Sequence, residues 1–352
     1  MLSHGIGFDK TYWDLSFNNY NYSYVDVALM AGYHTVAIDR LGIGNSSHGD
    51  PLNFIQAPAE VSALNEVTKK LRAGTFPQVS TAFKKVVHVG HSFGSAQTYL
   101  LTALYPSASD GIILTGFSMN ATWVPVTIAD WNLRIARLNQ PFRFGNISLT
   151  SAHKDYSMVS QYGSDIVSVF DMVLGALGID VNSQEVWTDI ATTEVGNILN
   201  NLNGSVPGVP QNLPNMYLTW PDLTANQFAF LYPAHFDPAL ALVAEATKQP
   251  VTVGEIFTLA NGAPNVNSFT GPVQIVTGQQ DAIYCGGDCL ATGDPALASI
   301  PAAVKKNFPQ ASAFEVYIQP NTGHGINAHY NSSGVYQVIQ VREDLERHGN
   351  NS

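Results

Sequence analysis

The stretch KVVHVGHSFGSAQTYLLTAL, residues 85–104, decides the fold. It begins as a short apolar run with β-branched residues, which is typical of a buried strand, and continues with apolar residues at helical spacing. Between the two lies Gly90-His91-Ser92-Phe93-Gly94, which has the form G-x-S-x-G. A serine in that place sits on a tight turn that exposes its hydroxyl, and the two glycines remove side chains where the backbone passes close to its neighbours. The stretch therefore predicts a nucleophilic serine, Ser92.

Apolar strand-like runs alternate with helical patterns on both sides of this turn, which predicts an α/β fold with a mostly parallel sheet. We expect helices over 23–30 and 61–74, and strands over 33–39, 85–90, 111–115, 272–277 and 314–319. The alternation stops between 117 and 268, where prolines and most of the tryptophans gather. The predicted organisation is a core of 1–116 and 269–347, a helical cap inserted at 117–268, and a disordered tail at 348–352.

Composition excludes several classes of partner. The 352 residues are 45% hydrophobic and carry a net charge of -11 with only 16 Lys and Arg, so no basic surface for nucleic acid is expected. No apolar run reaches the length of about 18 residues that suggests a membrane-spanning helix. The two cysteines have no paired histidines and no dinucleotide fingerprint is present, so we expect no metal and no cofactor.

The turn in this context resembles the α/β-hydrolase superfamily, most closely its secreted, esterase-like fungal members. The resemblance covers residues 4–116 and 271–347, whereas the cap is matched only by its position. It implies a catalytic triad in the chain order Ser, acid, His. Asp281, which closes PVQIVTGQQD, fits the acid, with Asp288 and Asp294 as alternatives. His324, in NTGHG after a strand, fits the base, with His329 and His235 as rivals.

Two further loops carry the resemblance. His4-Gly5-Ile6-Gly7 is similar to the oxyanion loop of the superfamily, which implies that the backbone N–H groups of Ile6 and Phe93 bind the developing oxyanion. An ordinary glycine turn is the alternative. Residues 39–46 have the form D-x-x-G-x-G-x-S of the superfamily's next loop, in which we expect Asp39 to be structural rather than catalytic.

Two features favour the secretory route. Cys285 and Cys289 are the only cysteines, and the glycines of CGGDC allow so short a loop to close into a disulfide; two free buried thiols are the alternative. Sequons for N-glycosylation occur at Asn21, Asn45, Asn120, Asn146, Asn203, Asn331 and Asn350. We expect an extracellular glycoprotein.

The expected function is hydrolysis of a carboxylic ester or lactone through an acyl-enzyme. The cap has few basic residues, which favours an uncharged, apolar small molecule as substrate. A peptidase or amidase on the same fold is one alternative. A non-catalytic ligand-binding protein is another. The oligomeric state stays open.

The N-terminal strands are expected to be missing from this sequence: the strand that leads into the His-Gly loop and the two that precede it in the superfamily. In the superfamily the His-Gly loop follows a strand that lies between those expected here at 33–39 and 85–90, yet only Met1-Leu2-Ser3 precede His4. A gap in the middle of a sheet costs about 1 to 3 kcal/mol for each buried unpaired backbone group. We therefore expect Met1 to be an internal methionine of a longer protein that also carries the secretion signal. A compact variant without the first strands is the alternative.

Expression of residues 1–352 alone is accordingly expected to give insoluble or inactive protein. An upstream extension that supplies an apolar strand ending at Ser3 should restore activity, because it pairs the exposed backbone groups. Soluble yield and hydrolysis of an ester would be measured for both lengths. Full activity of the short chain would contradict the expectation.

Overall fold

The structure, a computed structural model, describes residues 1–77, 79–145, 212–259 and 263–349. The chain forms two compact units. One consists of Met1–Arg134 with Met216–Ser352, and the other of Ile135–Asn215. The second unit is shorter than the cap expected at 117–268, because residues 117–134 and 216–268 belong to the first unit.

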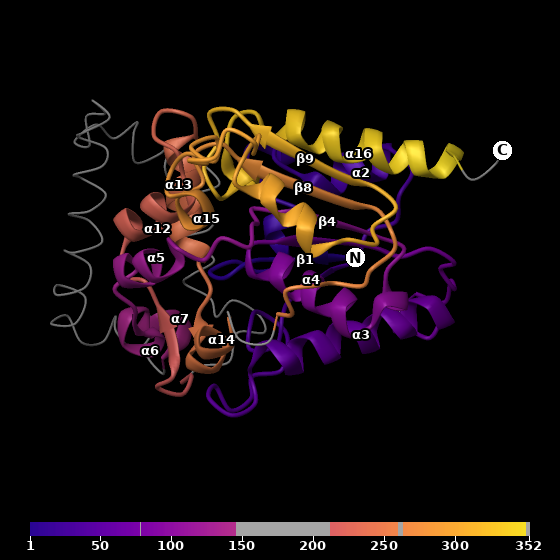
Figure 1. The fold of residues 1–352 in the computed structure, drawn as a ribbon. Coiled ribbons are helices and arrows are strands. Elements are labelled where there is room, and N and C mark those ends of the chain that lie inside the picture. Colours follow the sequence, from indigo (N-terminus) through magenta and orange to yellow (C-terminus); the bar gives the residue numbers. More distant parts are fainter. Residues whose placement is uncertain (78, 146–211, 260–262, 350–352) are drawn as a thin grey trace, which may run out of the picture. The chain divides into compact units, whose positions relative to one another are not determined.

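The first unit is built on a parallel sheet of six strands in the order β2-β1-β3-β4-β8-β9 (Figure 1). Its strands are β1 (Leu2–Ser3), β2 (Ala37–Ile38), β3 (Val87–His91), β4 (Gly111–Thr115), β8 (Val273–Gly278) and β9 (Phe314–Gln319). β4 and β9 have the predicted bounds, and β3 and β8 differ from them by one or two residues. β2 is much shorter than the strand expected at 33–39. The mostly parallel α/β sheet expected from the sequence is confirmed.

The position between β2 and β3 is occupied by β1. Leu2 pairs with Ala37 on one side and with Val89 on the other, and Ser3 continues both ladders. The Val89 N–H also donates a 2.9 Å hydrogen bond to the Met1 carbonyl. The gap expected in the middle of the sheet is therefore filled over these residues. That the natural protein extends upstream of Met1 stays a prediction.

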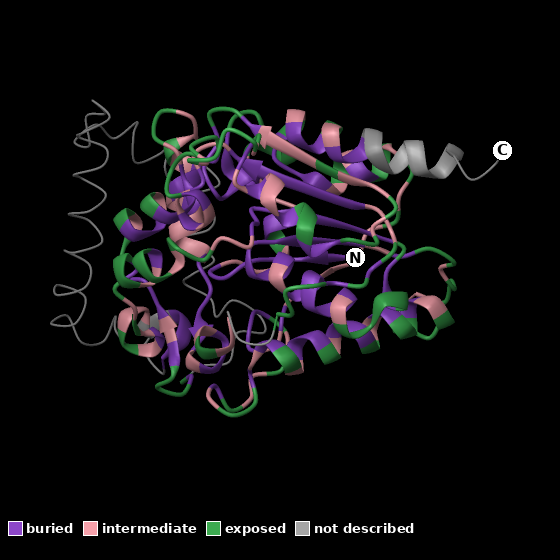
Figure 2. Ribbon diagram, in the orientation of Figure 1, coloured by how far each residue is buried: buried purple, intermediate pink, exposed green. Residues whose placement is uncertain are grey.

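Helices cover both faces of the sheet (Figures 1 and 2). α2 (Tyr24–Met30) and α16 (Ser332–Gly349) pack on the face to which β4 presents Ile113. Ile112 and Leu114 point to the opposite face, where Tyr99 of α4 (Phe93–Leu104) packs against them. α3 (Ala57–Ala73) packs in turn on α4. The central strands β1, β3, β4 and β8 are therefore almost entirely buried, as their continuous apolar runs require.

The predicted helix ends agree with their capping residues. The Ser23 hydroxyl accepts a hydrogen bond from the Asp26 N–H at the start of α2, and Gly74, with a φ of 66°, ends α3. At the carboxyl end of the chain α16 continues through His348 and Gly349. These two residues are therefore helical, although the sequence assigned them to a disordered tail.

The stretch expected to be a purely helical cap also contains strands. β6 (Tyr217–Thr219) and β7 (Val251–Thr252) form an antiparallel pair in the first unit. The other elements of this unit between 117 and 268 are α5 (Val124–Asp130), α12 (Leu223–Phe230), α13 (Pro238–Thr247) and α14 (Val253–Thr258). The described part of the second unit holds α6 (Ala136–Asn139) and α7 (Pro141–Phe144), and β5 (Arg134–Ile135) lies at the junction of the two units.

Short helices complete the first unit. They are η1 (Lys10–Trp13), α1 (Phe17–Tyr20), η2 (Pro106–Ala108), α15 (Ala282–Cys285), η3 (Pro301–Asn307) and η4 (Ile326–Ala328). Three of them come after the carboxyl ends of strands: η1 follows β1, α15 follows β8 and η4 follows β9. These ends meet at one edge of a parallel sheet, which is where binding sites of open α/β folds lie.

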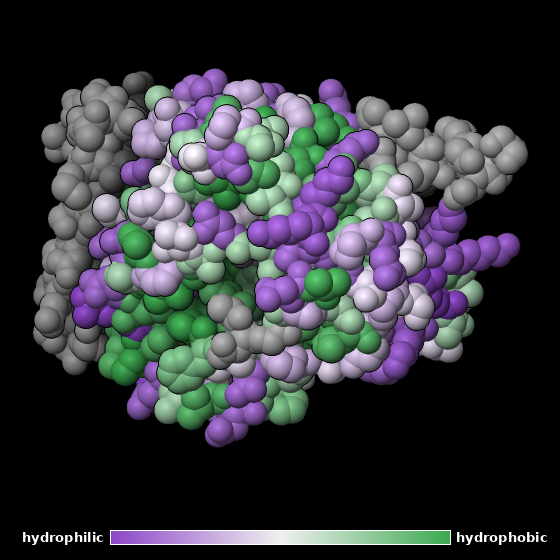
Figure 3. Space-filling view, viewed as in Figure 1, coloured by the Kyte–Doolittle hydropathy of each residue, from purple (hydrophilic) through white to green (hydrophobic). Residues whose placement is uncertain are grey.

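The length of the helices and the exposure of the sequon residues are relevant to the expected extracellular localisation. No helix in the described ranges is long and apolar enough to span a bilayer, and the face in Figure 3 mixes hydrophilic and hydrophobic side chains. The sequon residues Asn21, Asn45 and Asn331 are exposed and Asn120 is half-buried, whereas Asn146, Asn203 and Asn350 lie outside the described residues. Glycosylation and secretion stay predictions.

The turn after β3 leaves no space for a methyl group at Gly94. A Cβ there would lie 2.3 Å from the Ser3 carbonyl oxygen and 2.7 Å from that of His4, both of them backbone atoms. We expect Gly94→Ala to destabilise the protein by at least about 3 kcal/mol, at the upper end of the cost of overpacking. Thermal unfolding and soluble yield would measure this.

Gly293→Asn provides the matched control. Gly293 has a φ of 69° and no atom within 4 Å of its ideal Cβ position, and asparagine tolerates positive φ better than most residues. We expect this variant to stay within about 1 kcal/mol of the parent. A Gly94→Ala variant that unfolds at the same temperature as the control would contradict the close approach.

Candidate active site

Ser92 lies on a strained turn between β3 and α4. Its φ of 54° and ψ of -115° lie outside the regions that side-chain-bearing residues favour. The Ser92 N–H donates a 2.9 Å hydrogen bond to the Thr115 carbonyl, and the Ser92 carbonyl accepts one from Ala96. Such strain costs about 1 to 3 kcal/mol and persists where the surroundings determine the conformation. The predicted tight turn is confirmed in its backbone.

His324 and Asp281 are hydrogen-bonded to each other. His324 Nδ1 lies 2.7 Å from Asp281 Oδ2, and both side chains are fully buried. The other carboxylate oxygen, Oδ1, accepts 2.9 Å hydrogen bonds from the Ile283 and Tyr284 N–H groups and so caps α15. Because Nδ1 donates to the carboxylate, Nε2 is left as an acceptor. Among the described residues, Nε2 has no hydrogen-bond partner.

Gly116 makes the space in which the imidazole of His324 reaches the turn. A Cβ on Gly116 would lie 3.0 Å from His324 Cε1 and 2.9 Å from His91 Cε1. Gly116 follows Thr115, whose carbonyl accepts from Ser92. The structure therefore brings the three predicted triad residues to the same edge of the sheet. The role of Gly116 was missed in the sequence, where the only signal was a glycine directly after the run GIILT.

The alternative acids and bases lie elsewhere. Asp288 and Asp294 are exposed and accept hydrogen bonds from backbone N–H groups of their own loop. His235 is half-buried and its ring stacks on Tyr232. His329 is bonded through both ring nitrogens to backbone groups. Within the described ranges, no three His, Cys, Asp or Glu side chains are grouped so that they could hold a metal ion.

The loop expected to form the oxyanion hole lies against Ser92. A Cβ on Gly5 would lie 2.9 Å from the Ser92 Cβ. His4 Nε2 accepts a 3.1 Å hydrogen bond from the Arg40 N–H, so its Nδ1 carries the proton and donates to the Gly5 carbonyl at 2.8 Å. Burial, assisted by the positive charge of Arg40, lowers the pKa of His4 to about 3. His4 is therefore neutral, and its hydrogen bonds hold this loop in place.

The N–H groups of Ile6 and Phe93 have no hydrogen-bond partner among the described residues. Ile6 follows the glycine that touches Ser92, and Phe93 is the first residue of α4. Two backbone donors without a partner in the described part of the chain therefore follow directly after Gly5, which touches Ser92, and after Ser92 itself. This is what an oxyanion hole requires, since its donors must be free to bind the developing charge.

The far end of the same loop is fixed by two contacts. Gly7, with a φ of 80°, lies so close to the indole of Trp220 that a Cβ would overlap it. The Gly7 carbonyl accepts a 2.9 Å hydrogen bond from the Gln249 N–H, just after α13. The loop is therefore held by His4 at its beginning and by the α12–α13 region at its end.

Arg40 is a buried cation that touches both sides of the candidate oxyanion hole. Its Nη1 donates to Glu60 at 3.0 Å and to Glu255 at 2.5 Å. Its guanidinium carbon lies 4.8 Å from the centre of the Phe93 ring, and Nη2 lies 3.5 Å from the Gly5 carbonyl oxygen. Burial lowers the pKa of Arg40, but the two carboxylates outweigh it and raise the pKa overall.

Its carboxylate partner Glu60 is also affected by burial, which raises the pKa of this residue well above its usual value. The second oxygen of Glu60 accepts a hydrogen bond from the Gln97 amide. Sequence reasoning did not single out Arg40, although it lies in the loop that carries the resemblance. Asp39, its neighbour, accepts hydrogen bonds from Lys10 and from the Asn45 N–H and thus has the structural role that was expected.

Cys285 and Cys289 form a disulfide, as predicted. Cys285 ends α15, the helix that Asp281 caps, and the Cys289 N–H donates a 2.7 Å hydrogen bond to the Gln279 carbonyl. The Gly287 N–H also donates to the Asp281 carbonyl at 2.9 Å. The bridge and these bonds close one compact loop around the acid.

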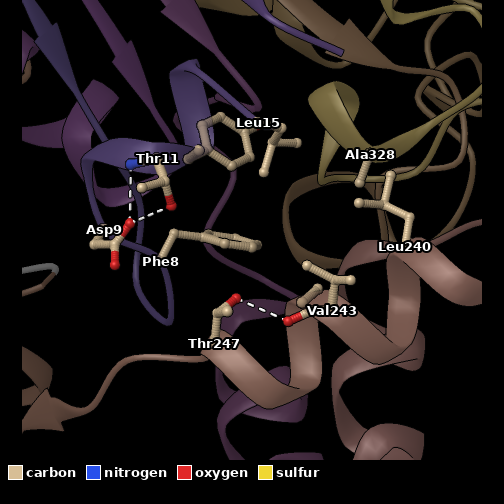
Figure 4. Close-up of a pocket in the computed structure, with 10 residues that line it drawn as sticks. Phe8, Asp9, Thr11, Leu15, Leu240, Val243, Thr247 and Ala328 are labelled. Carbon is tan, nitrogen blue, oxygen red and sulfur yellow. Dashed lines mark hydrogen bonds between the residues drawn. The ribbon is translucent and has the colours of Figure 1, made fainter. Parts of the chain in front are cut away.

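A small pocket lies between the segment that follows the His4–Gly7 loop and α13 (Figure 4). Its lining is mostly apolar and consists of Phe8, Asp9, Thr11, Tyr12, Leu15, Leu240, Val243, Ala244, Thr247 and Ala328. Two of these rings lie against His91, the residue before Ser92: the Tyr12 ring stacks on the His91 ring at 4.3 Å, and the Phe8 ring lies 6.2 Å from it. Asp9 is the one charged residue of this lining.

Comparison with known proteins identifies the family and the fold of the chain. Residues 1–335 match the alpha/beta hydrolase family. The methylesterase protein MES16 from Arabidopsis is similar in structure, with a TM-score of 0.52, 12% identity and 98% of both chains covered. These two findings confirm the α/β-hydrolase fold.

Two other solved structures are similar at lower scores. An esterase from Thermogutta terrifontis has a TM-score of 0.46, 15% identity and coverage of 98% of this chain and 88% of its own. The monoacylglycerol lipase of Paleococcus ferrophilus has a TM-score of 0.46, 10% identity and coverage of 97% and 91%. No curated protein sequence matches the chain significantly.

Removal of the buried cation tests the network around the loop. Arg40→Met leaves the carboxylates of Glu60 and Glu255 buried without their partner, so we expect a loss of about 3 to 5 kcal/mol of stability. Lys69→Met is the control, because Lys69 and Glu66 form an exposed ion pair whose loss costs about 1 kcal/mol at most. Urea unfolding of both variants measures the difference. Equal midpoints would contradict the role of Arg40.

Proposed function

Since this chain belongs to the α/β-hydrolase family, we propose that it is a serine hydrolase in which Ser92 is the nucleophile, His324 the base and Asp281 the acid. The observation that carries the proposal is the 2.7 Å hydrogen bond between His324 and Asp281, both buried at the edge of the sheet where the Ser92 turn lies. A carboxylate that holds one imidazole nitrogen leaves the other to take a proton.

The proposed reaction has two stages. The Ser92 hydroxyl oxygen attacks the carbonyl carbon of the substrate and its proton passes to His324 Nε2, while Asp281 stabilises the imidazolium. The carbonyl oxygen becomes an oxyanion that accepts hydrogen bonds from the Ile6 and Phe93 N–H groups. Collapse of this intermediate breaks the bond to the leaving group, which takes the proton from Nε2. Water then attacks the acyl-enzyme by the same steps and releases the acid.

We propose that the substrate is an ester or lactone of an uncharged, apolar small molecule. The pocket beside Phe8 and Tyr12 is lined mainly by apolar side chains, and its one charged residue, Asp9, is negative. Residues 117–268 also contain only five Lys and Arg, which leaves little positive charge to bind a free carboxylate or phosphate. Amide or peptide hydrolysis is the second candidate, because the same triad and oxyanion donors serve both reactions.

Secretion is proposed as well. Disulfides persist mainly in oxidising compartments, and the only two cysteines of the chain are paired. Three sequon asparagines are exposed, as attachment of glycans requires. Both observations support an extracellular protein.

Labelling with a fluorophosphonate probe and turnover of p-nitrophenyl esters test the nucleophile. Ser92→Ala removes the attacking oxygen, so we expect labelling to disappear and turnover to fall by at least about 10³-fold, with a melting temperature within a few degrees of the parent. Ser62→Ala, an exposed change on α3, should match the parent in all three measurements.

The same panel, extended to lactones and aminoacyl amides, separates the alternatives. Preferred turnover of amides would replace the esterase proposal with an amidase. A parent protein that neither reacts with the probe nor turns over any member of the panel would indicate a non-catalytic ligand-binding protein. Labelling of Ser92→Ala at the rate of the parent would refute the assignment of the nucleophile.

A further inference from the structure

His329 is a buried histidine that binds the loop of the proposed base. It is 1% exposed. Its Nε2 lies 3.0 Å from the Gly323 nitrogen and 3.0 Å from the Tyr232 nitrogen, and its Nδ1 lies 3.0 Å from the Gly325 carbonyl oxygen. Gly323 and Gly325 are the two residues that flank His324. One imidazole therefore bonds both neighbours of the base.

The hydrogen bonds fix the protonation state of this ring. Two backbone N–H groups point at Nε2, which must accept from both, so the proton is on Nδ1 and is donated to the Gly325 carbonyl. Burial lowers the pKa of His329 to about 4, with a smaller contribution from His235. The neutral ring is the only form that makes all three bonds.

The same loop is clamped from the other side by the end of α12. The Gly325 N–H donates a 2.8 Å hydrogen bond to the Phe230 carbonyl. A Cβ on Gly323 would lie 2.8 Å from the same Phe230 oxygen and 2.9 Å from the Tyr232 nitrogen. The backbone on both sides of His324 is thus bonded to His329, and at Gly325 also to the Phe230 carbonyl.

Other groups fix the imidazole of His324 but not its backbone. Asp281 holds Nδ1, and the rings of His91, Phe230 and Tyr284 lie 4.9, 5.9 and 5.8 Å from it. These contacts set the tilt of the ring. The position of the His324 Cα, from which the side chain extends, depends on the backbone of the Gly323–Gly325 loop, and therefore on His329.

We infer that His329 is a positioning residue for the base: it holds the Gly323–Gly325 loop, and ties it to the end of α12, so that His324 Nε2 reaches the Ser92 hydroxyl. This inference rests on the proposed function. Loss of the Nε2 acceptor leaves the Gly323 and Tyr232 N–H groups buried and unpaired, at about 1 to 3 kcal/mol each. The loop then shifts to find other partners, and a displacement of about 1 Å can cost about 10²-fold in rate.

Three substitutions of His329 distinguish the role of its Nε2 acceptor from that of its Nδ1 donor. Glutamine places an amide oxygen near the position of Nε2 and so keeps the acceptor. Asparagine places an amide N–H near the position of Nδ1 and so keeps the donor. Leucine keeps neither group. Since the acceptor serves two N–H groups, we expect kcat to fall by about 10²-fold in His329→Leu and His329→Asn but by less than about tenfold in His329→Gln. KM should change little, because His329 is 1% exposed and both of its ring nitrogens are bonded to backbone groups.

His88 supplies the matched control. It is also buried and bonded through both ring nitrogens, at 2.9 Å each to the Ser109 and Thr68 hydroxyls, but it lies near the start of β3, away from the catalytic edge. We expect His88→Leu to lower the melting temperature by an amount similar to His329→Leu and to leave kcat unchanged. Rates are compared at a temperature at which every variant is folded.

A second readout does not need turnover. The proton that His324 Nδ1 shares with Asp281 gives a far-downfield proton NMR resonance, which should shift or broaden in His329→Leu and stay unchanged in His88→Leu. If His329→Leu keeps both this resonance and the kcat of the parent, His329 is merely structural and the inference is overturned. If the parent protein neither labels nor turns over esters, the proposed function fails, whereas the resonance still decides whether His329 positions the His324–Asp281 pair.

Discussion

The backbone of α4 passes so close to the end of β1 that no side chain can stand between them. Gly94 is the residue at this contact, and the Ser3 and His4 carbonyl oxygens are the atoms it faces. Because the helix begins one residue after Ser92, the contact brings the first N–H of α4 next to the loop that leaves β1. The serine turn and the candidate oxyanion donors are therefore neighbours only because a strand of two residues lies in the middle of the sheet.

A buried ion network supports this contact from the side. Arg40 follows β2 closely, Glu60 lies on α3 and Glu255 on α14, so one guanidinium joins three separate parts of the unit. Buried charges are costly to desolvate, and their net contribution to stability is small unless every group is bonded. Arg40 also donates its N–H to His4 and packs on Phe93, so a single residue contacts both the loop after β1 and the start of α4.

The local parts of the fold and of the site could be predicted from the sequence, and the long-range parts could not. β4 and β9 have the expected ends because each is an apolar run with turn residues after it. β2 is shorter than its apolar run because its one partner in the described sheet, β1, offers only Leu2 and Ser3 for pairing. The short strands β6 and β7 were missed since runs such as YLT and VT show no periodicity.

The same distinction applies to the site. Ser92, Asp281 and His324 follow strands, and their positions relative to those strands suffice to nominate them. The contributions of Arg40, Gly116 and His329 depend on partners that lie far away in the sequence, such as Tyr232 for His329 and Glu255 for Arg40. His329 was noticed only as a rival base, because a histidine in a sequence does not reveal which backbone groups its nitrogens will bind.

Several histidines of this protein are buried in the neutral form, and this limits the acidity that the fold can withstand. Burial lowers the pKa of His4 to about 3 and that of His329 to about 4, and it lowers the pKa values of His88 and His91 well below their usual range. Below about pH 6.5 the unfolded chain binds protons at these four positions that the folded chain does not. Each of them then removes up to about 1.4 kcal/mol of stability per pH unit, until the folded pKa is reached.

The raised pKa of Glu60 acts in the opposite direction, whereas the lowered pKa values of His48 and Asp39 add to the effect of the four buried histidines. Acid therefore acts on this molecule as a denaturant. His4 and His329, whose hydrogen bonds hold the loops at Gly5 and at Gly323–Gly325, are among the groups through which it acts.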